Sequence, residues 1–299
     1  MADLNQITNE INNKSQYSPV DDVRRYYIGK LSSITNRNLI FYYSAFLTAP
    51  DNPAVAINDI DMNGFMSAIH KMDKKLGLDL IIHTPGGEVA AAENVGNYLR
   101  SVFNNDIRIF IPQMAMSAGT MLSFIGSEIY MGRHSCIGPI DPQILGIPAW
   151  EVVQDFEKAL EDTSSDPSKI PIWQTRIAQY SPAFVGQCYK AVQLSSEVAN
   201  KWLSEGKMFD KDKEKQHKID CIMQYLNDNK NTKIHSRHIN PYKAKELGLN
   251  IKMLEDEEKL QDAVLSVHHC YMYAFQVSNA VKIIENNNNN AYILKTKNQ

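Results

Sequence analysis

The chain has 299 residues, of which 43% are hydrophobic and 22% are charged. These proportions are typical of a globular protein with a substantial core, and they exclude collagen-like and wholly disordered chains. The 31 basic and 34 acidic residues give a formal net charge of −3. No excess of positive charge therefore favours binding to nucleic acid or to an anionic membrane surface.

The cysteines and the apolar segments indicate the compartment. The chain has four cysteines: Cys136, Cys188, Cys221 and Cys270. They are far apart and form no CxxC pair, so we expect neither a disulfide framework nor a thiolate zinc site, and a cytoplasmic location. Residues 1–16 lack the basic start and apolar stretch of a signal peptide. The apolar segment 107–125 is interrupted by Arg108 and Pro112, so we interpret it as strand, turn and buried helix and not as a membrane span.

Strand and helix patterns alternate in the first half of the chain. The expected elements are, in order, a strand at 38–46, a helix at 64–72, a strand at 78–83, a helix ending near Phe103, a strand at 107–111, a helix beginning near Ser117 and a strand at 128–131. Strand, turn and helix repeated in this way predict right-handed βαβ units and a parallel sheet.

The second half of the chain is predicted to be mainly helical. Apolar stripes at 152–160 and 185–202 have helical spacing, and the mixed charges of 207–218 indicate a solvated helix entry. The asparagine run 286–290 is of low complexity and predicts a mobile tail. We therefore divide the chain into an N-terminal arm, a core, a helical C-terminal region and an Asn-rich flexible tail, at 1–37, 38–205, 206–285 and 286–299.

Two turns lie where ligands bind in open α/β sheets, between the carboxyl end of a strand and the start of a helix. The first, His83-Thr-Pro-Gly-Gly87, leaves backbone N–H groups unshielded at a helix N-terminus, which suits an oxyanion. The second places Ser117 among small residues, where the positive helix end favours the alkoxide. Each pattern alone is ordinary, because a Gly-Gly turn is common and Ser is a favoured N-cap. Adjacent parallel strands would bring both turns to one edge of the sheet.

Four motifs in a fixed order carry a resemblance to a known family: Thr84-Pro-Gly-Gly87, Ala115-Met-Ser-Ala-Gly119, Ser127-Glu-Ile-Tyr-Met-Gly132 and Gly138-Pro-Ile-Asp-Pro142. Together they resemble the Clp-protease/crotonase fold, and within it the serine dehydrogenase proteinases, which are relatives of signal peptide peptidase A. The resemblance is specific over 38–145 and weaker to about residue 285. It implies an α/β fold of stacked ββα units with a parallel sheet, followed by a mainly helical C-terminal part.

The resemblance also implies roles for individual residues. Ser117 would be the nucleophile of a serine peptidase. The N–H groups of Gly87 and Ala118, together with that of Gly86, would form the oxyanion hole. Proteins of this fold usually form rings or stacked trimers, so a homo-oligomer is implied as well.

The general base is left open by the resemblance. Clp proteases proper use a Ser-His-Asp triad, but here the corresponding stretch, 137–141, holds no His, and the nearest is His134. Signal peptide peptidase A and its archaeal relatives use a Ser-Lys dyad, for which the candidates are Lys158 and Lys169. Lys158, the preferred candidate, lies opposite the apolar stripe of its predicted helix, although a lysine base needs burial to lower its pKa. Lys169 lies in a loop that could cover the site as a lid.

Histidines and one aspartate are accessory candidates. His83 lies next to the first turn, with packing at the strand end as its structural alternative, and Asp141 could orient a base or cap a turn. A histidine from the C-terminal part, such as His235 or His238, or from a neighbouring subunit could also serve Ser117. His235 and His238, and the adjacent His268 and His269, have no nearby Glu or Asp at ligand spacing, so we predict no metal site.

Three functions are compatible with these residues. The first is hydrolysis of peptide bonds in a protein or peptide through an acyl-enzyme on Ser117, which needs no metal, cofactor or ATP. The second is a crotonase-like acyl-CoA enzyme. Such enzymes usually have a carboxylate at the site, and Glu88 is the one carboxylate within either turn, which argues against this function. The third is a catalytically silent peptide-binding protein of the same fold. Peripheral attachment through a membrane-protein partner is a further hypothesis, and we expect no nucleic-acid binding.

Overall fold

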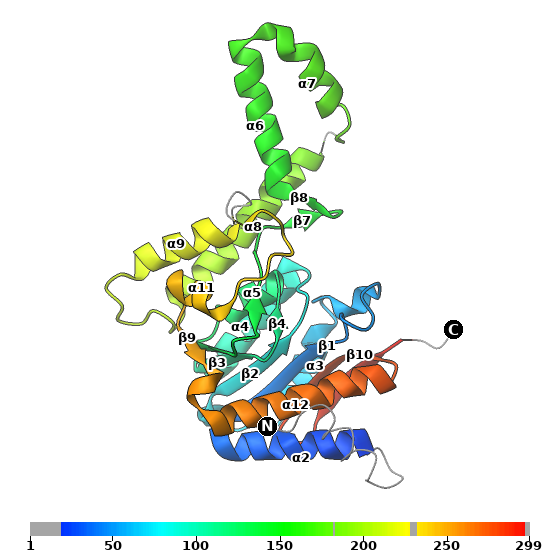
Figure 1. The fold of residues 1–299 in the computed structure, drawn as a ribbon, viewed down its shortest axis with the longest axis vertical. Helices are drawn as coiled ribbons and strands as arrows, with labels where there is room; N and C mark the ends of the chain where they lie inside the picture. The colour runs from blue at the N-terminus through cyan, green and yellow to red at the C-terminus, as the bar shows by residue number, and fades with distance from the viewer. Residues whose placement is uncertain (1–18, 182, 228–231, 297–299) are drawn as a thin grey trace.

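The computed structural model describes residues 19–181, 183–227 and 232–296, and its body is built around a seven-stranded sheet (Figure 1). The strands of this sheet are β1 (Asn38–Ser44), β2 (Leu78–His83), β3 (Ile107–Ile111), β5 (Glu128–Met131), β9 (Ile251–Met253), β10 (Ala280–Asn286) and β11 (Ala291–Lys295). Their order is β11-β10-β1-β2-β3-β5-β9. The neighbours β1-β2, β2-β3, β3-β5 and β5-β9 are parallel, whereas β10 is antiparallel to β1 and to β11. The α/β fold and the parallel sheet predicted from the sequence are confirmed.

Helices cover both faces of the sheet, and short elements connect them. The helices of the body are α2 (Pro19–Thr35), α3 (Asp61–Ile69), α4 (Val89–Phe103), α5 (Ala118–Ser123), α8 (Phe184–Glu205), α9 (Lys215–Asn227), α11 (Pro241–Glu246) and α12 (Glu258–Val277). Short 3-10 turns are η1 (Pro53–Val55), η2 (Lys74–Leu76) and η4 (Leu254–Asp256). Two small sheets pair β4 (Met114–Ala115) with β6 (Cys136–Ile137) and β7 (Gln143–Ile144) with β8 (Ile147–Pro148). Among the described helices, none is long and apolar enough to span a bilayer.

The central strands are nearly continuous apolar runs because helices bury both of their faces. All six residues of β2 are buried. Its carboxylate, Asp79, is held by Arg37 Nε at 2.8 Å and by Arg108 Nη2 at 2.6 Å. This pairing compensates the burial of a charge that would otherwise disfavour a strand at this position.

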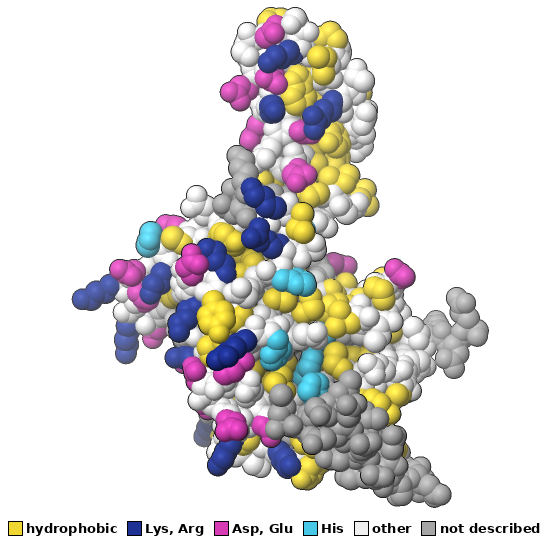
Figure 2. Space-filling view, in the orientation of Figure 1, with side chains coloured by type: hydrophobic (Ala, Val, Ile, Leu, Met, Phe, Trp, Pro, Cys, Tyr) yellow, Lys and Arg dark blue, Asp and Glu magenta, His cyan; other side chains and the backbone are white. Residues whose placement is uncertain are grey.

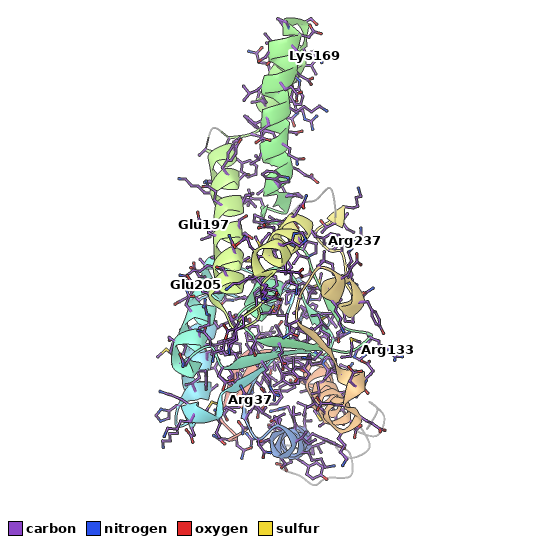
Figure 3. The ribbon with its side chains drawn as sticks, turned by 90° about the vertical axis from the view of Figure 1, so that its left-hand side faces the viewer. Arg37, Arg133, Lys169, Glu197, Glu205 and Arg237 are labelled. Carbon is purple, nitrogen blue, oxygen red and sulfur yellow. The ribbon has the colours of Figure 1, made fainter. Side chains whose placement is uncertain are left out.

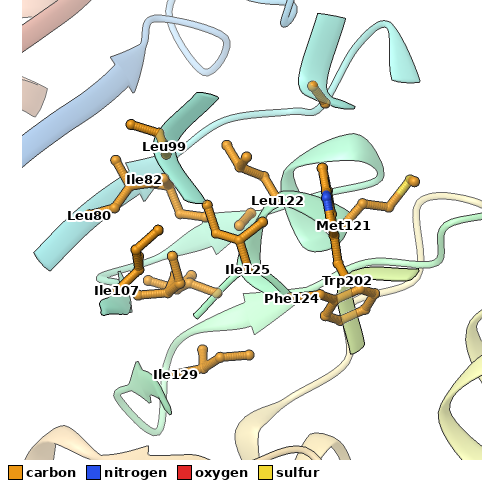
Figure 4. Packing of buried hydrophobic residues seen from close by; sticks show 14 of the residues in the cluster. Leu80, Ile82, Leu99, Ile107, Met121, Leu122, Phe124, Ile125, Ile129 and Trp202 are labelled. Carbon is orange, nitrogen blue, oxygen red and sulfur yellow. The ribbon is translucent and has the colours of Figure 1, made fainter. Parts of the chain in front are cut away.

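The larger hydrophobic core lies between the sheet and helices α3, α4, α5 and α8 (Figure 4). Leu80 and Ile82 of β2 point into it, whereas Ile81 points to the opposite face, as the two-residue period of a strand requires. Trp202 of α8 is fully buried against α4, and its Nε1 donates a hydrogen bond to Asn97 Oδ1 at 3.0 Å. This packing ties the long helix α8 to the body.

The opposite face of the sheet is covered by α2 and α12 (Figure 1). Val23, Ile28 and Leu31 of α2 are buried in this second core together with Phe41 of β1 and Tyr271 of α12. The second half of the expected N-terminal arm is therefore a packed helix. Residues 1–18 of that arm lie outside the described residues.

A helical projection extends away from the sheet (Figures 1 and 3). It consists of α6 (Ala149–Ser165), η3 (Pro167–Lys169), α7 (Ile170–Ile177) and the first part of α8. Its own small core joins Val152 and Val153 of α6 to Phe184 and Cys188 of α8. Hydrophobic side chains also lie along one side of its surface (Figure 2). Among the large hydrophobic residues of the projection, Leu160 is 70% exposed and Ile172 is 72% exposed.

The C-terminal part differs from the expected division of the chain. Region 206–285 is mainly helical, as predicted, with α9, α11 and α12, but it also supplies β9 and β10 to the main sheet. The predicted flexible tail instead forms β11, because the asparagine run closes a hairpin: Asn286 Oδ1 accepts hydrogen bonds from the N–H groups of Asn288 at 2.8 Å and Asn290 at 3.0 Å. Asparagine favours such turns because its short side chain can bond nearby backbone. Residues 297–299 of the expected tail lie outside the described residues.

Candidate active site

The two turns singled out in the sequence lie against each other at the carboxyl edge of the sheet. The Thr84 N–H donates a hydrogen bond to Met114 O at 3.1 Å, and the Met116 N–H donates one to Thr84 O at 3.0 Å. Strands β2 and β3 are parallel neighbours, so the segments that follow them leave the sheet at the same edge. The predicted meeting of the two turns is confirmed.

Ser117 stands immediately before α5 in an unusual backbone conformation. Its φ is 52° and its ψ is −120°, in a region that residues with a Cβ rarely occupy. Its side chain makes no capping hydrogen bond to the helix. Within the described part of the chain its hydroxyl has no hydrogen-bond partner, and the residue is half-buried. Ser117 therefore does not cap helix α5 with its side chain, which is the usual structural role of a serine at this position.

The glycines of the first turn are required by close packing. A Cβ on Gly86 would lie 2.5 Å from Met116 O and 2.8 Å from Ser117 Cβ, and the φ of Gly86 is +94°. A Cβ on Gly87 would lie 2.3 Å from Ile57 N, and the φ of Gly87 is +154°. No residue with a side chain fits either position without moving the backbone.

The N–H groups of the turns divide into used and unused donors. The Gly86 N–H donates to the Thr84 hydroxyl at 3.2 Å, so it is not available to a ligand in this conformation. Across the residues that the structure describes, the N–H groups of Gly87 and Ala118 donate to no protein acceptor. Two unused backbone donors thus accompany the Ser117 hydroxyl, an arrangement that can stabilise a developing oxyanion.

A pocket of about 810 Å³ opens at this point, and both Ser117 and Gly87 line it. Its other walls come mainly from segment 53–60, from Ile140 and Pro142, and from α8. Most of these side chains are apolar, and Glu88 is the one charged residue among them. The pocket can therefore hold an apolar group next to the hydroxyl and the two donors.

Residues 43–284 match the family described as ClpP-like SDH-type serine proteinases. The chain belongs to this family. The match covers both turns, the pocket walls and the projection, and it confirms the resemblance found in the sequence.

Two curated relatives are both uncharacterized proteins of Methanocaldococcus jannaschii. One is 34% identical over 110 residues, which is 37% of this chain and 38% of that protein. The other is 31% identical over 121 residues, which is 40% of each chain. The chain thus spans about two fifths of the length of the curated relatives that it matches.

The two candidate lysines lie on the projection, and neither lines the pocket. Lys158 is exposed on α6. Lys169 lies at the tip of the projection (Figure 3), where its Nζ is 3.0 Å from Asp162 Oδ1. The hydrogen bond to Asp162 raises the pKa of Lys169, which is opposite to the shift that a lysine base needs. Within one chain the structure does not bring either lysine to Ser117.

His83 is fully buried on the face of the sheet opposite α5. Its ring lies 4.7 Å from the ring of Phe46 and 5.3 Å from that of His268, measured between centroids. Burial lowers the pKa of His83 to about 3, and neither ring nitrogen has a hydrogen-bond partner among the described residues. The side chain thus packs beneath the turn and does not reach the pocket that Ser117 lines.

Asp141 is also fully buried, but behind a wall of the pocket. Its neighbours Ile140 and Pro142 line the pocket, whereas Asp141 does not. Asp141 Oδ1 lies 3.0 Å from Nδ1 of His235, which is 94 residues further along the chain. Both residues can be singled out in the sequence, but their pairing cannot, because no local signal connects such distant positions. His238 is exposed and takes no part in this pair.

Proposed function

We propose that the chain is a serine peptidase that hydrolyses peptide bonds through an acyl-enzyme on Ser117. One observation carries the proposal: the Ser117 hydroxyl, unbonded among the described residues and held on a positive-φ turn, lines a pocket together with Gly87, whose N–H is unused, and the next N–H along the chain, that of Ala118, is unused as well. Membership of a family of serine proteinases supports the same reading.

The reaction would proceed in two displacements. Ser117 Oγ attacks the carbonyl carbon of the substrate, and the N–H groups of Gly87 and Ala118 donate hydrogen bonds to the oxygen as it becomes an oxyanion. The C–N bond then breaks, and the leaving amine takes the proton that a base removed from Ser117. Water attacks the resulting ester in the second displacement, which releases the acid and restores the hydroxyl. One oxyanion donor is typically worth about 10²–10³ in rate.

Among the described residues, no lysine or histidine lines the pocket to accept the proton of Ser117. Within the described residues that line the pocket, Glu88 is the sole titratable side chain, and it is exposed at the N-terminus of α4. A lysine of the projection could serve Ser117 from another copy of the chain, because the projection extends away from its own body (Figure 3). This proposal combines the Ser-Lys dyad with the homo-oligomer that the family resemblance implies.

The substrate would present an apolar side chain to the pocket. The walls from segment 53–60, Ile140, Pro142 and α8 are largely hydrophobic. Burying an apolar group contributes about 25 cal/mol for each Å² removed from water. We therefore propose a peptide with an apolar residue beside the scissile bond. No described feature favours a CoA thioester over a peptide.

Labelling with a fluorophosphonate probe tests the proposal. The purified protein should be labelled at one serine, Ser117, as mapped by mass spectrometry, and Ser117→Ala should abolish the label. Ser101→Ala is the matched control, because Ser101 is an exposed serine whose hydroxyl only bonds Tyr98 O within α4. Labelling of another serine, or none between about pH 6 and 9 where a Lys or His base would titrate, would contradict a nucleophilic Ser117.

A further inference from the structure

A buried polar network lies behind the first turn, 83–87, which we call the glycine turn. The side chains of this network do not line the pocket. Lys282 of β10 is completely buried, and its Nζ lies 2.7 Å from Asp61 Oδ1 and 2.7 Å from Ala56 O. The hydroxyl of Tyr42, on β1, donates to Asp61 Oδ2 at 2.7 Å. Strand β10, 221 residues further along the chain, thus meets β1 and the start of α3 around one carboxylate.

The network fixes residues 56–58, and these residues bond the glycine turn. It bonds Ala56 through Lys282, and it bonds Asn58 because Asp61 Oδ2 accepts the Asn58 N–H at 3.1 Å. Ile57, between them, donates its N–H to Gly86 O at 2.8 Å and accepts the Glu88 N–H at 2.9 Å.

The consequence of these bonds falls on Gly87. Both of its neighbours, Gly86 and Glu88, are fixed to Ile57, and Ile57 lies between the two residues that the network holds. The peptide plane of Gly87 therefore has little freedom to turn, although its own N–H makes no hydrogen bond to the described part of the protein.

Stability alone does not account for such a network. Burying an ion pair costs desolvation free energy that its attraction roughly repays, so apolar residues of similar volume often give equal stability. What a satisfied buried network supplies is a fixed geometry. Here the fixed geometry is that of the segment against which the glycine turn packs.

We propose that Lys282, Asp61 and Tyr42 are positioning residues, which aim the Gly87 N–H at the oxyanion. This inference rests on the proposed peptidase function. It assigns to the C-terminal strand β10 a part in catalysis, although β10 contributes no residue that lines the pocket.

The chain contains a matched control for this network. Glu285, also on β10, is completely buried, accepts a hydrogen bond from Arg24 Nε at 2.7 Å and another from the Tyr271 hydroxyl at 3.0 Å. This second network has the same kinds of group, a cation, a carboxylate and a tyrosine. It lies on the α2 and α12 face of the sheet, away from the glycine turn. Tyr42→Phe and Tyr271→Phe therefore each remove a buried hydroxyl that bonds the buried carboxylate of its own network, and only Tyr42 also bonds the glycine turn, through Thr84.

The first readout is the rate of reaction with a fluorophosphonate probe. Tyr42→Phe should lower the maximal inactivation rate constant about tenfold and leave the apparent affinity for the probe unchanged, since a misaimed donor affects the oxyanion and not the apolar pocket. Tyr271→Phe should change neither constant by more than about twofold. Asp61→Asn, in which the amide keeps the shape of the carboxylate, should act in the same direction as Tyr42→Phe.

The second readout does not depend on activity. Gly86-Gly87 is the sole Gly-Gly pair in the sequence, so labelling glycine with ¹³C at the carbonyl and with ¹⁵N gives one amide, that of Gly87, coupled to a labelled carbonyl. Its NMR resonance should shift in Tyr42→Phe and stay in place in Tyr271→Phe. An unmoved resonance in Tyr42→Phe, or equal shifts in both variants, would overturn the positioning role. A wild-type protein that fails to react with the probe would refute the peptidase alone, because the resonance still reports on the turn.

Discussion

At the residue scale, the site depends on two positions where the backbone is held in a conformation that few residues adopt. Gly87 has a φ of +154° and packs on the backbone of Ile57, and Ser117 has a φ of 52°. Both conformations are maintained by neighbours: the turn of Gly87 by Ile57, and that of Ser117 by the bonds between Thr84 and the backbone of β4 and Met116. Strained backbone of this kind is concentrated at functional sites.

Gly87→Ala tests the first of these positions. The added Cβ would lie 2.3 Å from Ile57 N, so the turn must move and the Gly87 N–H must turn with it. We expect the rate of fluorophosphonate reaction to fall by about 10² or more, which is the loss of one oxyanion donor. Gly186→Ala is the control, because nothing lies within 4 Å of the Cβ it would add. A Gly87→Ala protein that reacts as fast as the control would remove Gly87 from the oxyanion hole.

The burial of His83 should make the free energy of unfolding depend on pH. Burial lowers its pKa from 6.5 to about 3 in the folded protein. The unfolded chain therefore binds the proton first, and stability is full above about pH 6.5 and is lost as the pH falls toward 3. From pH 7 to pH 5 the free energy of unfolding should fall by about 2 kcal/mol from this group. His268, whose pKa burial also lowers, acts in the same direction.

Urea unfolding at pH 7 and at pH 5 measures this effect. His83→Phe, similar in shape and without the unpartnered nitrogens, should lose less stability between the two pH values than the wild type by about that amount. His238→Gln, at an exposed histidine, should retain the wild-type difference. Identical pH dependence in His83→Phe and in the wild type would show that His83 is not the group responsible.

At the element scale, helix α8 runs from the core of the projection into the main core of the body, where Trp202 makes a close contact with α4. Trp202 packs directly over Gly96 of α4, where a Cβ would come 2.5 Å from Trp202 Cζ2. The indole also bonds Asn97 through its Nε1. Because the pocket has walls from α8, a displaced α8 would change the pocket as well as the core.

Gly96→Ala should therefore destabilise the protein, although alanine is the better helix former. Overpacking a buried contact typically costs about 1–3 kcal/mol. Gly29→Ala, on helix α2, is the opposite case: nothing lies within 4 Å of its Cβ, and we expect a gain of about 0.5–1 kcal/mol. Thermal or denaturant unfolding of the two variants checks the signs, and a stabilised Gly96→Ala would mean that α4 and α8 pack more loosely than described.

At the scale of the whole molecule, the candidate nucleophile and the candidate lysines are on different parts. Ser117 lies at the edge of the sheet, whereas Lys158 and Lys169 lie on the projection (Figures 1 and 3). Under the proposed arrangement, a lysine from this projection would reach the Ser117 of another copy of the chain. The exposed apolar side of the projection (Figure 2) is suited to such contacts, since large exposed apolar patches mark interaction sites.

Mixing two inactive variants tests this arrangement. A Lys158→Met/Lys169→Met chain and a Ser117→Ala chain should each fail to react with the probe, whereas the two expressed together should react, because the lysines of one copy serve the Ser117 of the other. The measurement is probe labelling of the co-purified assembly. Full reactivity of the double lysine variant alone would exclude both lysines as the base, and no recovery on co-expression would exclude a lysine supplied by another copy.

Sequence alone determined the local framework of the site. Strands β2, β3 and β5 have the bounds that their apolar runs predicted, because buried parallel strands bounded by turn residues leave a pattern in a few consecutive residues. The glycine turn and Ser117 could be found for the same reason. Their meeting followed from parallel order alone, since neighbouring parallel strands end at one edge.

Only the tertiary structure decided what distant residues do. Lys282 and Asp61 are 221 residues apart, and Asp141 and His235 are 94 apart. Their pairing depends on which strands and loops become neighbours, and no periodicity or motif records that. The asparagine run likewise resembles a tail in the sequence. In the structure it is the turn of a hairpin, because β10 pairs with β1 and β11 pairs with β10. The roles of lysine and histidine side chains also depend on burial. Whether such a side chain is a base, a structural residue or a solvated charge is set by surroundings that the whole fold creates.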